Sequence, residues 1–322
     1  MPKFAEIVLK KCLGLKNDEK FLIVTDSELN HIAEIFYEQS KKITNNVKLI
    51  ETPIPKVNGT EPDPEVAKEM LGYDVELLIT SKSLSHTQAR KNACDKGVRI
   101  VTMPGITEDI MERAIDIDYD RLMMVHKKLG DIIDDGEKVK IQTVLGTDFS
   151  FSIYGRKAFG RDSGLFTSKG TFGNLPTGEI FIAPVEGTAN GIFVVDASFA
   201  GIGKLEKPIK IYVENGYVVK IDGDKSEMLD KLLDSVGKGA RNIAEFGIGT
   251  NEKAQITGNI LEDEKVIGTC HIALGNNAGF GGKVNVQLHL DGIIKKPTIW
   301  VDNKKIINDG KLLIQSNQKL FK

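Results

Sequence analysis

The spacing of apolar residues changes near residue 135, and this change constrains the fold more than any other feature of the chain. Before it, continuous apolar runs such as KFLIVTD (20–26) alternate with amphipathic stretches, which is typical of a parallel α/β layer. After it, apolar and polar residues alternate singly, in runs that end at Gly, Asn-Gly or Asp-Gly, which is typical of half-buried strands. The sequence therefore predicts an N-terminal parallel α/β domain at 1–135 and a predominantly β (α+β) domain at 136–322.

The same patterns place the individual elements. In the first part, strands are predicted at 20–26, 46–51, 75–81 and 98–105, and helices at 30–42, 63–71, 86–97 and 107–134, the last broken near 116–118. In the second part, YVENGYVV predicts a hairpin, because Asn-Gly fits a type I′ turn. One helix is predicted there, at 226–246.

The stretch VNVQLHLDG (284–292) alternates apolar and polar residues and is predicted to be a strand with one face on a core. Its polar face carries His289 and Asp291, which stand two residues apart and should point to the same side. Water-exposed strand faces usually carry Lys, Thr or Glu, so an imidazole beside a carboxylate suggests a metal site.

Composition excludes several classes of function. A formal net charge of −2 argues against nucleic acid as a partner. The N-terminus lacks the apolar core of a signal peptide, and no apolar run is long enough to cross a bilayer, so a cytoplasmic protein without a membrane partner is expected. The three cysteines are widely spaced and odd in number, which favours reduced thiols and excludes a Cys-based zinc site.

Candidate metal ligands gather in the second domain. His271 and His289 are its two histidines, and the acids in unusual surroundings are Glu179, Glu245, Glu264 and Asp291. Each has an ordinary alternative as a surface or hydrogen-bonded residue. The ordinary alternative is weakest for Glu245, because a carboxylate within AEFGIG is costly to bury unless it is paired or binds a metal.

This set of nitrogen and oxygen donors suits divalent metal ions. The four carboxylates would bring four negative charges into one site, and two divalent ions would neutralise them, whereas one would leave two charges uncompensated. A two-metal centre also requires a bridging carboxylate, for which Glu245 is the candidate. The sequence thus predicts a dinuclear site in the β-rich domain.

Several stretches resemble the thermophilic metalloaminopeptidase family, also called the aminopeptidase T family. They are NLPTGEIFIAP, EFGIGTN, LEDEK followed by GTCHIALG, the Gly pair at 281–282, and LHLDG followed by PTIWVD, and the likeness covers residues 140–305. The resemblance implies a homodimeric enzyme with two ions of zinc, cobalt or manganese that removes N-terminal residues from short peptides. It also implies metal ligands at Glu179, Glu245, Glu264, His271, His289 and Asp291, with Glu245 as the catalytic base.

The chain departs from that family in two places. The family's peptidases carry a tyrosine seven residues after the first metal-binding histidine; here that position is Ala278, with Phe280 nearby, and no tyrosine follows Tyr217. The interval from Glu264 to His271 is two residues longer than usual. Metal binding is therefore expected independently of peptidase activity.

Two alternatives remain from the sequence. The resemblance extends to a ring-cleaving 2,5-dihydroxypyridine dioxygenase with a single Fe(II), whose two histidines and one aspartate would correspond to His271, His289 and Asp291. Against it, a mononuclear site would leave Glu179 and Glu245 without a partner. The other alternative is a non-catalytic relative that binds a metal or a small ligand.

Overall fold

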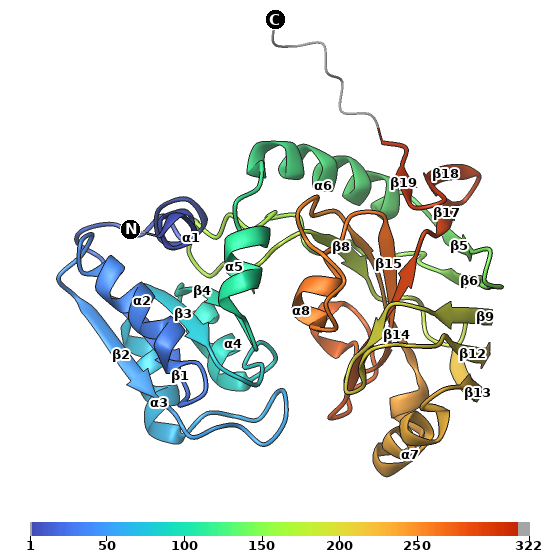
Figure 1. Cartoon of the computed structure of the whole chain (residues 1–322), viewed down its shortest axis with the longest axis horizontal. Coiled ribbons are helices and arrows are strands. Elements are labelled where there is room, and N and C mark those ends of the chain that lie inside the picture. Colours follow the sequence, from blue (N-terminus) through green and yellow to red (C-terminus); the bar gives the residue numbers. More distant parts are fainter. Residues whose placement is uncertain (1, 315–322) are drawn as a thin grey trace, which may run out of the picture. The chain divides into compact units, whose positions relative to one another are not determined.

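The computed structural model describes residues 2–314, and these divide into two compact units (Figure 1). The first unit contains residues 2–119 and 164–177, and the second contains 120–163 and 178–314. An α/β unit is thus followed by a β-rich one, as the sequence predicts.

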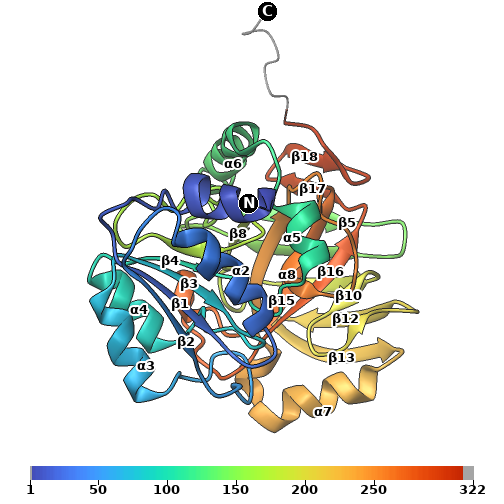
Figure 2. The same ribbon diagram turned by 60° about the vertical axis from the view of Figure 1, so that its left-hand side comes forward.

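The first unit is built on a parallel sheet with strand order β2-β1-β3-β4-β7. Every residue of β1 and β3 is buried, because helices cover both faces of the sheet. Leu22 and Val24 of β1 pack with residues of α3 and α4, and α2 lies on the other side of the strands (Figure 2). The strands are β1 (Phe21–Thr25), β2 (Val47–Glu51), β3 (Val75–Ile79), β4 (Arg99–Thr102) and β7 (Phe172–Asn174). The helices are α1 (Lys3–Glu6), η1 (Ile7–Cys12), α2 (Asn30–Ser40), α3 (Pro64–Glu69), η2 (Met70–Gly72), α4 (Gln88–Asp95) and α5 (Glu108–Ala114).

The second unit contains two antiparallel sheets that share one core. Phe151 of one sheet and Phe246 of the other lie with ring centroids 5.4 Å apart inside this core. One sheet has the order β11-β10-β16-β15-β14-β8, with strands β8 (Glu179–Ile182), β10 (Ser198–Phe199), β11 (Gly203–Lys204), β14 (Ile243–Gly249), β15 (Thr269–Gly275) and β16 (His289–Lys295).

The other sheet has the order β13-β12-β9-β6-β5-β17-β18-β19. Its strands are β5 (Lys138–Gln142), β6 (Asp148–Ser152), β9 (Asn190–Val195), β12 (Ile209–Glu214), β13 (Tyr217–Gly223), β17 (Thr298–Val301), β18 (Lys304–Asn308) and β19 (Lys311–Leu312). The helices of this unit are α6 (Tyr119–Asp134), α7 (Ser226–Val236), η3 (Lys238–Arg241), α8 (Ile260–Asp263) and η4 (Ala278–Phe280). The hairpin β12–β13 turns at Asn215 and Gly216, both with positive φ, as a type I′ turn requires.

The division between the units differs from a single cut near residue 135. Leu129 and Ile133 of α6 belong to the core of the second unit, so this helix packs with the β-rich part. Conversely, β7 comes from beyond the cut and pairs with β4 in the first unit. Long-range packing, which the local pattern does not reveal, determines both assignments.

Two element predictions in the second unit are wrong in extent. The helix predicted at 226–246 ends at Val236, because Gly237 takes a positive φ, and residues 243–246 belong to β14 instead. The strand predicted at 284–292 begins only at His289. Residues 284–288 form a loop that hydrogen-bonds to 276–278, so their alternation reflects loop packing and not a sheet.

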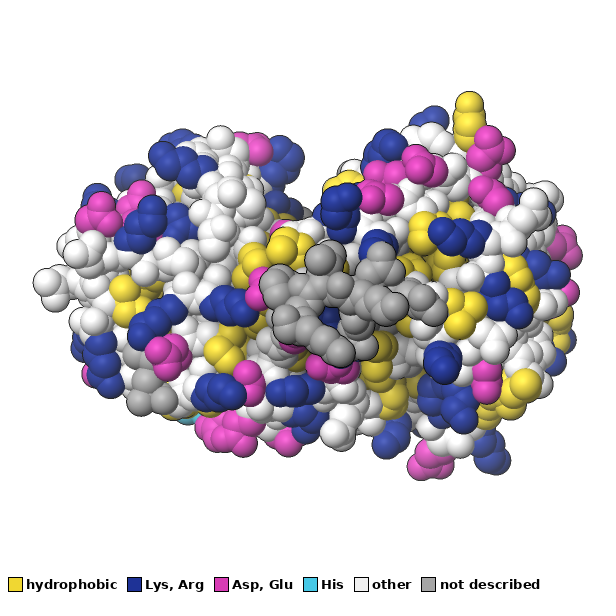
Figure 3. Space-filling view, turned by 90° about the horizontal axis from the view of Figure 1, so that it is seen from above, with side chains coloured by type: hydrophobic (Ala, Val, Ile, Leu, Met, Phe, Trp, Pro, Cys, Tyr) yellow, Lys and Arg dark blue, Asp and Glu magenta, His cyan; other side chains and the backbone are white. Residues whose placement is uncertain are grey.

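None of the described helices is long and apolar enough to cross a membrane. On the face seen in Figure 3, lysine and arginine side chains are interspersed with aspartate and glutamate. The expectations of a cytoplasmic homodimer without a nucleic-acid or membrane partner stay predictions.

Candidate functional site

The candidate ligands lie on one face of the sheet that contains β8, β14, β15 and β16. Glu245 of β14 is opposite Ala273 of β15, which is in turn opposite Asp291 of β16. His289 stands opposite Gly275 in the next row of that face. The small residues between the polar ones leave the space above the sheet to the carboxylates and imidazoles.

His271 depends on a glycine of the neighbouring strand. It stands opposite Gly247 of β14, and a Cβ at that glycine would lie 2.0 Å from His271 Nε2. The imidazole therefore extends over the backbone of β14 at Gly247, where a side chain on β14 would collide with it. The pairing of β14 with β15 shifts between Ile243 and Glu245, and such a bulge alters the direction of the following side chain.

Glu245, His289 and Asp291 form the first of two groups suited to a metal ion. His289 Nε2 lies 3.5 Å from Glu245 Oε2 and 3.4 Å from Asp291 Oδ1. The other ring nitrogen, His289 Nδ1, lies 2.8 Å from the carbonyl oxygen of Asn276. A donor hydrogen on Nδ1 fixes the ring so that Nε2 faces the two carboxylates, which is the usual arrangement of a metal-binding histidine.

Glu179, Glu264 and His271 form the second group. His271 Nε2 lies 3.3 Å from Glu179 Oε2 and 3.1 Å from Glu245 Oε1, so this imidazole links the two groups. The structure thus brings all six predicted residues together, but in two sets of three. Glu264 follows α8 directly and lies in the cluster despite its longer interval to His271.

The second group also contains Lys265, a residue that the sequence did not indicate. Its ammonium group donates hydrogen bonds to Glu179 Oε1, at 2.6 Å, and to Glu264 Oε1, while its side chain is only 2 % exposed. In LEDEKVIG a lysine among acids is typical of an exposed turn, so no local signal could have found it. Its positive charge reduces the metal charge needed to balance the four carboxylates.

Burial and mutual charge shift the pKa values of these groups. Burial raises the pKa of Glu245, and it raises that of Glu264 to about 8 against the opposing charge of Lys265. Burial also acts on Asp291, but the positive charge of His289 outweighs it and lowers the pKa of Asp291 to about 2.

Both imidazoles have raised pKa values. Burial alone would lower them, but Glu245 and Glu179 raise that of His271 to about 9, and Asp291 and Glu245 raise that of His289 to about 10. Both rings therefore carry a proton at neutral pH in the metal-free protein, and a metal ion must displace these protons to bind.

The donor set fits a divalent ion. Among the described residues, Glu179 Oε2 and Asp291 Oδ1 are buried without a hydrogen bond. Each has only an imidazole Nε2 nearby, at 3.3 and 3.4 Å, and a metal ion in place of the imidazole protons would satisfy both oxygens. The available donors are nitrogen and oxygen, which suit Zn, Co, Mn and Fe(II). Cys270 is adjacent in β15 but points to the opposite face, and burial raises the pKa of its thiol.

The objection that a single ion would leave Glu179 unpartnered no longer holds, because Glu179 Oε1 accepts a hydrogen bond from Lys265. Glu245 lies 3.1 Å from His271 Nε2 and 3.5 Å from His289 Nε2, so an ion held by these two imidazoles would also lie close to Glu245. Four carboxylates therefore do not require two ions.

An aromatic cluster borders the first group. The ring of Phe280 contacts His289 edge-on at 5.8 Å and Phe181 edge-on at 5.6 Å, and Phe181 stacks on Phe159 at 5.7 Å. Phe181 shares its strand face with Glu179, two residues earlier in β8. Phe280 lies in η4, which begins at Ala278, the position of the missing family tyrosine.

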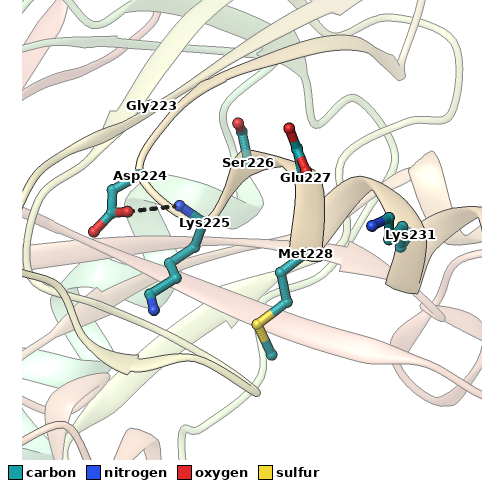
Figure 4. Close-up of a pocket in the computed structure, with 7 residues that line it drawn as sticks. All are labelled: Gly223, Asp224, Lys225, Ser226, Glu227, Met228 and Lys231. Atoms are coloured by element: carbon teal, nitrogen blue, oxygen red, sulfur yellow. Dashed lines mark hydrogen bonds between the residues drawn. The ribbon is translucent and has the colours of Figure 1, made fainter.

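A separate surface pocket of about 580 Å³ lies at the turn between β13 and α7 (Figure 4). It is lined by residues 223–228 and Lys231, none of which belongs to the cluster. In the turn, Asp224 accepts a hydrogen bond from the backbone of Lys225. These side chains form neither of the two metal-compatible groups, and we assign no chemistry to this pocket.

Comparison with known proteins shows the family. A model of the 2,5-dihydroxypyridine 5,6-dioxygenase (NicX) family matches residues 6–314. The chain belongs to this family. The 2,5-dihydroxypyridine 5,6-dioxygenase of Pseudomonas putida KT2440 is 21 % identical over 254 residues, which are 73 % of this chain and 70 % of that protein.

Two solved structures share the fold. The 2,5-dihydroxypyridine dioxygenase from P. putida KT2440 superposes with a TM-score of 0.86 at 17 % identity, over 98 % of this chain and 97 % of that one. Wild-type AmpT, the aminopeptidase T from Thermus thermophilus, gives a TM-score of 0.74, also at 17 % identity, over 97 % and 98 %. The resemblance to aminopeptidase T therefore holds for the fold, whereas the family is that of the dioxygenase.

Proposed function

We propose that this NicX-family protein is a mononuclear, Fe(II)-dependent dioxygenase that opens a dihydroxylated pyridine ring. The observation that carries the proposal is a set of two histidines and one carboxylate, His271, His289 and Asp291, on one face of adjacent strands. This set is typical of non-haem Fe(II) oxygenases. Family membership supports the same reaction class.

His271, His289 and Asp291 would hold the ion, which supplies the redox chemistry that allows dioxygen to react with the ring. Glu245 would act as the general base of this site, because its carboxylate lies 3.1 Å from His271 Nε2 and 3.5 Å from His289 Nε2 and so borders the ion position. Burial raises its pKa above the ordinary value of a glutamate, which makes the carboxylate a stronger base. We assign it the proton that a ring hydroxyl loses when the substrate binds.

The aromatic cluster suits a planar substrate. Phe280 packs edge-on against Phe181 and His289, and Phe159 at the other end of the cluster is 39 % exposed, so a planar ring can stack on the exposed face of Phe159. Aromatic pairs of this kind contribute about 0.5–1.5 kcal/mol beyond the burial of area. A short peptide would gain little from this surface unless its first residue were aromatic.

A dinuclear aminopeptidase acting on small peptides is the second candidate. It is favoured by the fold shared with AmpT and by the second metal-compatible group, Glu179, Glu264 and His271. It would use two ions of zinc, cobalt or manganese, with Glu245 as bridge and base. Ala278 in place of the family tyrosine weighs against it, since one lost donor to the transition state costs about 10²–10³ in rate.

The test is oxygen uptake by protein reconstituted with Fe(II) under anaerobic conditions and then given 2,5-dihydroxypyridine and air. We expect one dioxygen consumed per ring lost, no activity in His289→Ala, and full activity in the exposed control His31→Ala. Release of N-terminal residues from peptides with zinc, cobalt or manganese, without oxygen uptake, would support the second candidate. Bound metal without either reaction would indicate a non-catalytic relative.

A further inference from the structure

We propose that the ammonium group of Lys265 occupies the cation position formed by Glu179, Glu264 and His271, and thereby limits this site to one divalent ion. The inference rests on the metal site of the proposed function and deepens it, because it states how many ions the cluster accepts. The single ion would bind at His289 and Asp291 of the other group, with His271, the imidazole that links the two groups, as its third ligand.

The position of Lys265 is set by hydrogen bonds at both ends of the residue. Its Nζ donates to Glu179 Oε1 at 2.6 Å and to Glu264 Oε1, one oxygen from each acid of the group. Its backbone oxygen accepts from the amide of Asn251 at 2.8 Å, and its amide donates to Glu262 O at 2.9 Å. The ammonium group is therefore held inside the cluster from an anchored backbone.

The segment before Lys265 is itself fixed from within. Asn259 caps α8, and the buried carboxylates of Glu262 and Asp263 accept hydrogen bonds from the backbone amides of Gln255 and Thr257. A lysine on a loose surface turn could turn its side chain to water, whereas this one follows a helix whose own acids point inward. The local structure therefore holds Lys265 towards the site.

An ion at the second group would share both carboxylates with the ammonium group. A divalent metal on the same oxygens would displace the ammonium from its acceptors, and one on the other oxygens of Glu179 and Glu264 would lie beside it, so either way two cations would be buried together. Such repulsion is weakly screened where the side chain is 2 % exposed. Among the described residues, no ammonium group occupies the first group: Glu245 and Asp291 lie 3.5 and 3.4 Å from His289 Nε2, a nitrogen that can itself bind a metal.

The experiment counts ions in the full-length protein. Metal-free wild type, Lys265→Met and the exposed control Lys231→Met are loaded with Mn²⁺, separated from free metal, and analysed for manganese per chain. We expect one ion in the wild type and in the control, and two in Lys265→Met. The electron paramagnetic resonance spectrum should change from that of an isolated Mn²⁺ to that of a coupled pair, because paired ions lie about 3.5–4 Å apart.

The outcomes separate the two proposals. One ion in both the wild type and Lys265→Met, or two in the wild type, would overturn the role of Lys265 while leaving the metal site intact. No ion in the wild type would overturn the metal site itself. If Lys265→Met unfolds without metal, Lys265→Gln is tested in its place, and recovery of its fold by Mn²⁺ at two ions per chain supports the inference, whereas recovery at one ion overturns it.

Discussion

Replacement of Gly247 by alanine should remove His271 from the metal site. The added Cβ would lie 2.0 Å from His271 Nε2 and 2.1 Å from Cε1, whereas real Cβ contacts are practically never shorter than 3.0 Å. The imidazole must therefore move by about 1 Å. Metal–nitrogen bonds tolerate about 0.2 Å, so the bond to His271 would be lost.

The expected cost has two parts. Loss of one ligand should weaken metal binding at least about 100-fold, since even outer partners of metal ligands contribute 10–100-fold. Overpacking of the sheet face should lower the free energy of unfolding of the metal-free protein by about 1–3 kcal/mol. The backbone of Gly247 has no positive φ, so alanine adds no backbone strain there.

The assay is calorimetric titration of metal-free protein with Mn²⁺, together with urea unfolding in the absence of metal. Gly72→Ala is the matched control, because a Cβ at Gly72 meets nothing within 4 Å and its φ is not positive. Wild-type metal affinity in a folded Gly247→Ala protein would refute the assignment of His271 as a ligand that extends over β14.

Three further outcomes are expected. In urea unfolding, Glu76→Met should raise the free energy of unfolding by about 1–3 kcal/mol at pH 8 and by less at pH 5. Among the described residues, the carboxyl oxygens of Glu76 are buried without a hydrogen-bond partner, and burial raises its pKa well above 4.5, so the wild type loses stability as pH rises above the pKa of the unfolded chain. An equal or negative effect at both pH values would contradict this. Burial lowers the pKa of His126 to about 4, so as pH falls below 6.5 this histidine takes up a proton in the unfolded chain before it does in the folded protein. The free energy of unfolding should therefore fall by about 3 kcal/mol between pH 6.5 and 4, and His126→Gln should reduce this fall. Metal affinity should rise between pH 6 and 9, because His271 and His289, with pKa values of about 9 and 10, must release protons; a binding enthalpy that does not depend on the ionisation heat of the buffer would argue against this.

Local sequence determined the two kinds of sheet. The buried run at Phe21–Thr25 requires cover on both faces, and only a parallel sheet between helices provides it, whereas single alternation at Ile209–Glu214 requires one covered face. The Asn215-Gly216 turn follows from the backbone that these two residues adopt easily. The local sequence also indicated a functional site, because a carboxylate at Glu245 among apolar residues needs a partner wherever the strand lies.

Only the tertiary structure decided how the six candidate ligands are grouped. Their separation into two sets depends on strand register, which pairs Glu245 with Ala273 and His271 with Gly247, and no local period encodes such pairings. Lys265 reaches Glu179 across 86 residues of chain, because folding brings the segment after α8 to the first residue of β8. A lysine after three acidic residues is typical of an exposed turn. Lys265 is nevertheless a buried cation, because folding placed two carboxylates around it.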